Sequence, residues 1–163
     1  MIVYHGSTEI IKNPDVVHSK KYLDFGRGFY ITTFENQAKK WAVRKGMRQE
    51  KNAIVNVYEL SEAWDDFKVL SFEKENEKWL DFVCACRKRQ PLNKEYDIII
   101  GNVADDDVFK TVDMYFRGLW NKEKVLGELR YYKMNNQICI VNQETLNRLV
   151  TFKRAYEVEN NGR

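Results

Sequence analysis

Histidine and cysteine are scarce in this sequence, which has two histidines and three cysteines among its 163 residues. An odd number of cysteines without a secretory segment indicates reduced thiols, so we expect a cytoplasmic protein without disulfide bonds. Cys84 and Cys86 have no second Cys/His pair at the matching spacing that a zinc site requires. We therefore expect the cysteines to pack in the core and expect no metal site.

Long apolar runs and a strong excess of one charge are also missing. No apolar segment approaches the roughly 20 residues of a membrane-spanning helix, and the N-terminus lacks a signal-peptide pattern. We therefore expect no membrane contact. The 27 basic and 24 acidic residues give a formal net charge of +3, which is too small to imply a nucleic-acid partner by itself.

The chain has the length of one domain and shows no linker, repeat or low-complexity segment. Runs of β-branched and aromatic residues predict strands at 2–4, at the end of 24–33, and at 53–60, 67–70, 96–101, 137–141 and 152–158. Helical periodicity predicts helices at 35–44, 74–87, 105–119, 122–131 and 144–149. We expect a single α+β domain over residues 1–158 and a disordered tail at 159–163.

The first predicted helix carries a narrow apolar stripe. Ala38, Trp41 and Ala42 share one face with Lys45, whose side chain is expected to lead out into solvent. Gly46 follows and is expected to end the helix.

Three short motifs lie at the ends of predicted strands: HGS at residues 5–7, FGRGFYIT at residues 25–32, and NQ at residues 136–137. Each allows an ordinary interpretation. The first can be a turn, the aromatic residues can be core, and the glutamine can be the exposed end of a strand. The order of the three motifs favours a common site instead.

In this order and spacing, the motifs resemble the ADP-ribosyltransferase superfamily, in the branch that includes diphtheria toxin and the poly(ADP-ribose) polymerases. The segments YDIIIGNVADDDVF, NNQICIV and FKRAYEV are similar to an uncharacterised bacterial family placed among those enzymes. The similar stretches span most of the chain. The resemblance implies a split, mainly antiparallel central sheet with interleaved helices, and NAD as a substrate.

The resemblance assigns NAD-binding roles to residues of the first two motifs. His5 would hydrogen-bond a ribose hydroxyl, and Gly6 would let the backbone approach the nicotinamide amide. Tyr30 would stack on one face of the nicotinamide ring and Trp41 on the other, where the family usually has tyrosine. Arg27 would face either the pyrophosphate or solvent. The expected NAD-binding set is completed by Ser7, Gly28 and Thr32.

Gln137 takes the position of the family's catalytic glutamate, and His5 and Tyr30 complete the expected catalytic set. Glutamine can bind the ribose 2′-hydroxyl, but losing the carboxylate could cost catalysis on the order of several kcal/mol. Three outcomes stay open: slow transfer of single ADP-ribose units, replacement of the carboxylate by Glu128 or Glu144, or NAD binding without turnover. Chain elongation is the least expected.

We therefore expect an NAD-dependent mono-ADP-ribosyltransferase, a glycosyltransferase that cleaves the nicotinamide–ribose bond through an oxocarbenium-like transition state. Its acceptor is a protein or a nucleic acid, which the sequence leaves undecided. By analogy with the family, the chain would be a bacterial toxin with a partner antitoxin. A catalytically silent NAD- or ADP-ribose-binding module is the alternative. An RNA-modifying relative with an Arg/His-rich phosphate site is disfavoured, because the chain has only two histidines.

Overall fold

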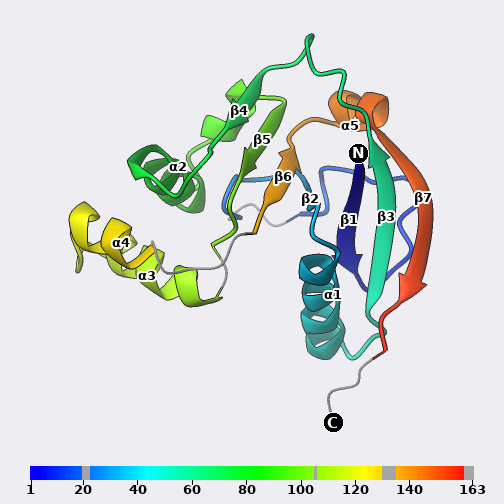
Figure 1. The fold of residues 1–163 in the computed structure, drawn as a ribbon, viewed down its shortest axis with the longest axis horizontal. Coiled ribbons are helices and arrows are strands. Elements are labelled where there is room, and N and C mark those ends of the chain that lie inside the picture. Colours follow the sequence, from blue (N-terminus) through cyan, green and yellow to red (C-terminus); the bar gives the residue numbers. More distant parts are fainter. Residues whose placement is uncertain (20–22, 105, 130–134, 160–163) are drawn as a thin grey trace.

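The computed structural model describes residues 1–19, 23–104, 106–129 and 135–159, whose strands form two sheets (Figure 1). One sheet is antiparallel and has the order β1 (Ile2–Ser7), β3 (Ile54–Leu60), β7 (Val150–Glu157). The other has the order β2 (Phe29–Ile31), β6 (Gln137–Ile140), β5 (Ile98–Gly101), β4 (Val69–Ser71). Its β4–β5 pair is parallel, and its other pairs are antiparallel. The prediction of an α+β chain with mainly antiparallel strands is confirmed.

The two sheets meet at one backbone bridge between β1 and the residue that follows β2. The amide of Tyr4 donates to the carbonyl of Thr32 at 2.8 Å, and the amide of Thr32 donates back at 3.0 Å. Within the described residues no longer ladder joins the sheets. The edges of β1 and β2 are therefore joined by backbone hydrogen bonds at one point.

Helices cover each sheet separately. Helix α1 (Glu35–Gln49) packs on β1 and β3, whereas α2 (Glu77–Arg87), α3 (Asp106–Phe116) and α4 (Lys122–Leu129) contact one another beside the other sheet (Figure 1). A short 3-10 helix, Leu92–Glu95, follows α2, and α5 (Gln143–Leu149) connects β6 to β7. The four-stranded sheet and its helices thus form one half of the chain's core, and the three-stranded sheet with α1 forms the other.

Apolar residues that the sequence places on the strands and helices fill both halves. Val3, Tyr58 and Ile140 are fully buried in the cluster that joins the sheets. Trp79 and Val112 are fully buried in the cluster between the four-stranded sheet and α2–α4. Helix α2 begins where the Asn76 side chain accepts from the Trp79 amide at 3.0 Å, which satisfies one unpaired donor of the first turn.

The first strand is longer than predicted and includes the HGS motif. Gly6 and Ser7 pair with Val55 and Ile54 of β3, so the interpretation of HGS as a turn is wrong. The alternation of burial along β1 is broken because both Gly6 and Ser7 are buried. His5 consequently sits within a fixed strand rather than in a flexible connection.

Helix α1 is also longer than predicted, and Gly46 does not end it. The helix continues to Gln49, and Glu50 closes it with a φ of 52°, in the left-handed region. Gly46 is buried, and a Cβ there would lie 2.7 Å from the carbonyl oxygen of Lys51. Gly46 therefore lets the chain that follows the helix pass close beside it. The rule that a glycine ends a helix does not predict this role.

The remaining predicted strands and helices are present, with ends shifted by a few residues. Cys84, Cys86 and Cys139 are free and buried, as expected. Across the described part of the chain, no helix is long and apolar enough to cross a membrane. Asp105, the end of the helix predicted at 122–131, and tail residues 160–163 lie outside the described residues.

Candidate functional site

A pocket of about 620 Å³ opens between the two sheets. It is lined by β1, β2, β6, α1, α3 and the end of α2, together with the loops that precede β2 and follow β5. This volume is typical of small-molecule sites, which run from about 300 to 1,000 Å³. Five residues that the sequence analysis selected line it: His5, Gly6, Tyr30, Trp41 and Gln137.

Four other selected residues are not among those that line the pocket. Ser7 is buried, and its hydroxyl lies 3.4 Å from the amide of Glu9. Thr32 is fully buried, and its hydroxyl donates to Asn136 at 2.8 Å. Both residues support the strands that carry the pocket.

Arg27 and Gly28 are likewise not among the residues that line the pocket. The Arg27 side chain is exposed, which agrees with its solvent interpretation and not with a pyrophosphate contact in this pocket. Gly28 is buried against β6, where a Cβ would lie 2.4 Å from Sγ of Cys139. Its role is therefore the close packing of β2 on β6.

His5 is held as a neutral imidazole. Its Nδ1 lies 2.6 Å from the Tyr30 carbonyl oxygen, and the ring stacks on Phe29 with 4.5 Å between centroids. A carbonyl only accepts, so Nδ1 carries the proton and Nε2 is left as an acceptor. Burial and the nearby Lys45 ammonium lower the pKa of His5 to about 3. At neutral pH the ring can therefore accept a hydrogen bond from a ligand hydroxyl.

The hydroxyl of Tyr30 is used inside the protein. It donates to the Gly26 carbonyl at 2.5 Å and accepts from the Phe25 amide at 3.1 Å. Burial raises the pKa of this phenol well above its usual value. Because the hydroxyl is held by its own loop, Tyr30 offers the pocket an aromatic ring rather than an acid or a base.

Gly6 brings α1 to the pocket. A Cβ on Gly6 would lie 2.3 Å from the carbonyl oxygen of Ala38 and 2.7 Å from the amide of Ala42, so only glycine allows this approach. One turn further on, Nζ of Lys45 donates to the Gly6 carbonyl at 2.9 Å. The expectation that Lys45 leads into solvent was wrong. Instead it lines the pocket with Trp41 of the same helix.

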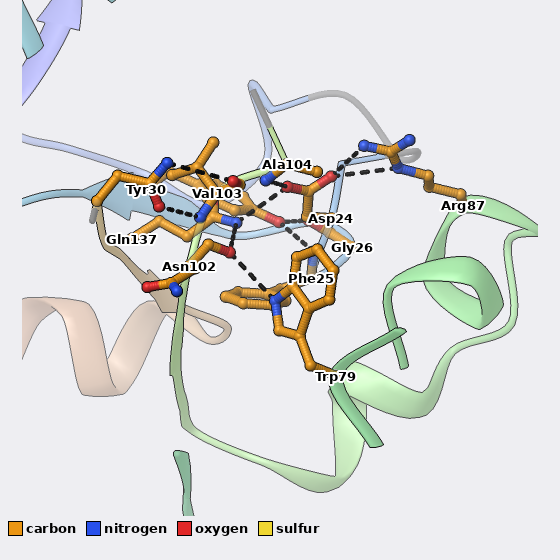
Figure 2. Close-up of polar contacts among 11 residues, drawn as sticks. Asp24, Phe25, Gly26, Tyr30, Trp79, Arg87, Asn102, Val103, Ala104 and Gln137 are labelled. Atoms are coloured by element: carbon orange, nitrogen blue, oxygen red, sulfur yellow. Dashed lines mark hydrogen bonds and ion pairs between the residues drawn. The ribbon is translucent and has the colours of Figure 1, made fainter. Parts of the chain in front are cut away.

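Gln137 is not the exposed strand end that its ordinary interpretation requires. It is 4% exposed, and its side-chain Nε2 donates to Asp24 Oδ2 at 3.1 Å and to the Asn102 carbonyl at 3.2 Å (Figure 2). The neighbouring Asn136 turns the other way and bonds Thr32, Thr33 and Gln37. Gln137, for which the sequence analysis expected a catalytic role, therefore lies in the pocket wall and is hydrogen-bonded to a carboxylate.

That carboxylate, Asp24, was missed by sequence reasoning. It lines the pocket and pairs with Arg87 at 2.5 Å, and the two side chains are only 10% and 14% exposed. Its only sequence signal is its place directly before the FGRGFYIT motif. Glu128 and Glu144, the predicted substitutes, are exposed and absent from the pocket lining.

The side of the pocket that α1 forms is cationic. Lys45 and Arg48 lie three residues apart on α1, and Arg87 enters from the end of α2. The second lining carboxylate, Asp113, lies 3.3 Å from Arg117. Lys45 and Arg48 suit a ligand that is anionic on the side of α1, whereas Arg87 is paired with Asp24. Among the described residues no cluster of three or more His, Cys, Asp or Glu side chains could hold a metal ion.

Comparison with known families adds a single finding. A family model described as a protein of unknown function (DUF3990) matches residues 1–152. The chain belongs to this family. The match to DUF3990 covers every described residue of the pocket, from His5 to Gln137. A search among curated proteins found no match to this DUF3990 chain.

Proposed function

We propose that this DUF3990 chain binds NAD in the pocket and is a mono-ADP-ribosyltransferase. One observation carries the proposal: His5, Tyr30 and Gln137, which lie far apart in the sequence, line a single pocket of suitable volume. These are the three positions at which the sequence resembles the ADP-ribosyltransferases. The resemblance rests on short segments of the sequence, whereas the convergence rests on how the chain folds, so the two support the proposal separately.

Each side chain has a chemically suitable role. Nε2 of neutral His5 would accept from a ribose hydroxyl, and the rings of Tyr30 and Trp41 would stack on nicotinamide. Lys45 and Arg48 would lie near the pyrophosphate in place of Arg27, since guanidinium and ammonium groups bind phosphate oxygens. The aromatic pair would hold the leaving group in one orientation before the bond breaks.

The reaction breaks the bond from C1′ of ribose to the nicotinamide nitrogen. Nicotinamide leaves with the bonding electrons, the acceptor's lone pair forms the new bond to C1′, and the acceptor loses its proton. The positive charge that develops on the ribose is stabilised by nearby negative charge. The pocket offers Asp24 for this purpose, but Arg87 neutralises it. We therefore expect slow transfer of single units.

The same ion pair supports a second candidate, an NAD- or ADP-ribose-binding module without turnover. A carboxylate that is paired with a guanidinium contributes little field to a ligand beside it. The two candidates share the binding step and differ only in whether the nicotinamide–ribose bond is broken.

The test incubates the protein with NAD labelled on the adenylate phosphate, in the presence of cell lysate. Binding is measured by calorimetry and released nicotinamide by chromatography. Transfer of label with release of nicotinamide supports the transferase. Binding without release supports the module, and no binding rejects both.

The acceptor and the biological setting belong to the proposal as well. Label appearing on protein or on nucleic acid in the lysate would identify the acceptor class. The roles of toxin and antitoxin partner follow from the resemblance alone, and growth arrest on expression, lost in a His5 variant, is the expected sign.

A further inference from the structure

Asp24 has all its hydrogen-bonding capacity in use. Oδ1 accepts from Nε and Nη2 of Arg87 at 3.2 and 2.5 Å. Oδ2 accepts from the Ala104 amide at 2.9 Å and from Nε2 of Gln137 at 3.1 Å (Figure 2). A carboxylate has about four lone-pair sites, so these contacts fill them. A ligand in the pocket therefore interacts with Asp24 through Gln137 rather than directly.

The polarity of the Gln137 amide follows from these contacts. Nε2 faces two groups that can only accept, the Asp24 carboxylate and the Asn102 carbonyl. Turning the amide over would place Oε1 against both oxygens, which is unfavourable at each. Nε2 is therefore fixed, and Oε1 is left as an acceptor. No described residue donates a hydrogen bond to Oε1 of Gln137.

We propose that Asp24, held by Arg87, is a positioning residue that fixes Oε1 of Gln137 as an acceptor for a ligand hydroxyl. The inference rests on the proposed function for the identity of that hydroxyl, the 2′-hydroxyl of the nicotinamide ribose. The pocket would then select a ribose that carries a donor at this position. It would reject one that carries only an acceptor there.

The arrangement also gives a physical reason for glutamine at position 137. A glutamate would place a carboxylate oxygen where Nε2 lies, at about 3 Å from Asp24 Oδ2 and from the Asn102 carbonyl. Two carboxylates this close do not both ionise. Glutamate at 137 therefore fits only when it is protonated.

This consequence can be tested without any ligand. In Gln137→Glu, protonation of the new side chain is favoured in the folded state, so the folded pKa exceeds the unfolded one. Stability is then retained at low pH and lost as pH rises through the folded pKa. We expect the Tm of Gln137→Glu to approach wild type near pH 5 and to fall below it by roughly 5–10 °C near pH 8.

The matched background is Asp24→Asn, which removes the opposing charge. The pH-dependent difference in Tm should shrink to a few degrees when the double variant Asp24→Asn/Gln137→Glu is compared with Asp24→Asn alone. Besides Asp24, the charged groups that line the pocket are Lys45, Arg48, Arg87 and Asp113, and none has a hydrogen bond to Gln137 within the described residues. A pH-dependent difference in Tm that persists in the Asp24→Asn background would overturn the inference.

A second measurement tests the ligand side. Affinity is compared for NAD and for an analogue with 2′-fluorine on the nicotinamide ribose, an acceptor-only substituent that also resists cleavage. We expect the wild type to prefer NAD by roughly tenfold or more, because fluorine faces Oε1 without a hydrogen bond. Gln137→Met should abolish the preference, and Asp24→Asn should reduce it. Asp113→Asn, at a pocket carboxylate without contact to Gln137, should preserve it.

The outcomes separate the inference from the proposed function. Equal binding of NAD and the analogue by wild type overturns the inference while NAD binding stands. If neither ligand binds, the proposed function is rejected. If the Tm of Gln137→Glu still depends on Asp24 and pH in that case, the fixed orientation of the Gln137 amide stands. Absence of that dependence overturns the inference whatever the ligand data show.

Discussion

The Nδ1 atom of His5 lies 2.6 Å from the backbone carbonyl oxygen of Tyr30, across the opening between the two sheets. The contact lies next to the Tyr4–Thr32 bridge, so the imidazole extends the joint between β1 and β2 by one hydrogen bond. The same bond fixes the tautomer of a ring that lines the pocket. The His5 side chain therefore both helps to join the two sheets and offers a binding group to the pocket.

The acid sensitivity of the protein should report this partly buried ring. The pKa of His5 is lowered to about 3 by burial and then by Lys45, against about 6.5 in an unfolded chain. Between these values the unfolded state binds more protons, so stability falls as pH falls below about 6.5. The free energy of unfolding changes by at most about 1.4 kcal/mol per pH unit from this group. Urea unfolding near pH 5 and near pH 7.5 measures it.

His5→Asn is the control, because its amide can still donate to the Tyr30 carbonyl but does not titrate. This variant should lose part of the acid sensitivity between the two pH values. Identical slopes for wild type and His5→Asn would show that the ring is protonated as easily in the folded chain as in the unfolded one.

A methyl group on Gly6 should destabilise the protein before any ligand is present. In Gly6→Ala the Cβ meets the backbone of α1 at Ala38 and Ala42, so the helix must move. We expect a loss of about 1–3 kcal/mol in the free energy of unfolding, or more if α1 cannot shift. Gly127→Ala is the matched control, because nothing lies within 4 Å of its Cβ and it sits in α4. That variant should gain about 0.5–1 kcal/mol.

The order of elements was predictable because it rests on local patterns. The apolar runs at 53–60 and 137–141 and the periodic stripe of α2 are properties of short segments, and all three reappear in the structure. Gly46 shows where this reasoning stops. A glycine after a helical stripe predicts an end, but here a long-range approach of Lys51 requires the glycine inside the helix.

The pocket was predictable only where a motif resembled a known one. His5, Tyr30, Trp41 and Gln137 were found in this way and do line the same pocket. Asp24 carries no pattern of its own, since its importance comes from side chains on β6 and α2 that are distant in the sequence. Lys45 was misplaced for the same reason, because its partner is the carbonyl of Gly6 on β1, which is distant in the sequence. Single-sequence patterns contain no information on such pairings.

The cationic side of the pocket should bind the pyrophosphate, and the exposed Arg27 should not. We expect Arg48→Met to weaken NAD binding by about 1 kcal/mol, roughly fivefold, with a smaller dependence on salt concentration. Arg27→Met removes the same charge from outside the pocket lining and should leave affinity unchanged. Calorimetry at low and moderate salt distinguishes the two. A larger effect from Arg27 than from Arg48 would favour the pyrophosphate alternative that the sequence left open for Arg27.

The indole of Trp41 should report ligand binding by its fluorescence. It is the tryptophan that lines the pocket, whereas Trp79 is fully buried in the core beside α2. Stacking of nicotinamide should quench it, and Trp41→Phe should lose the quenching while keeping most of the affinity. Trp41→Ala should weaken binding by about 0.5–1.5 kcal/mol, because only then is an aromatic face removed. Trp64→Phe, outside the pocket lining, is the control for the signal. Quenching that survives in Trp41→Phe but disappears in Trp64→Phe would place the ligand elsewhere.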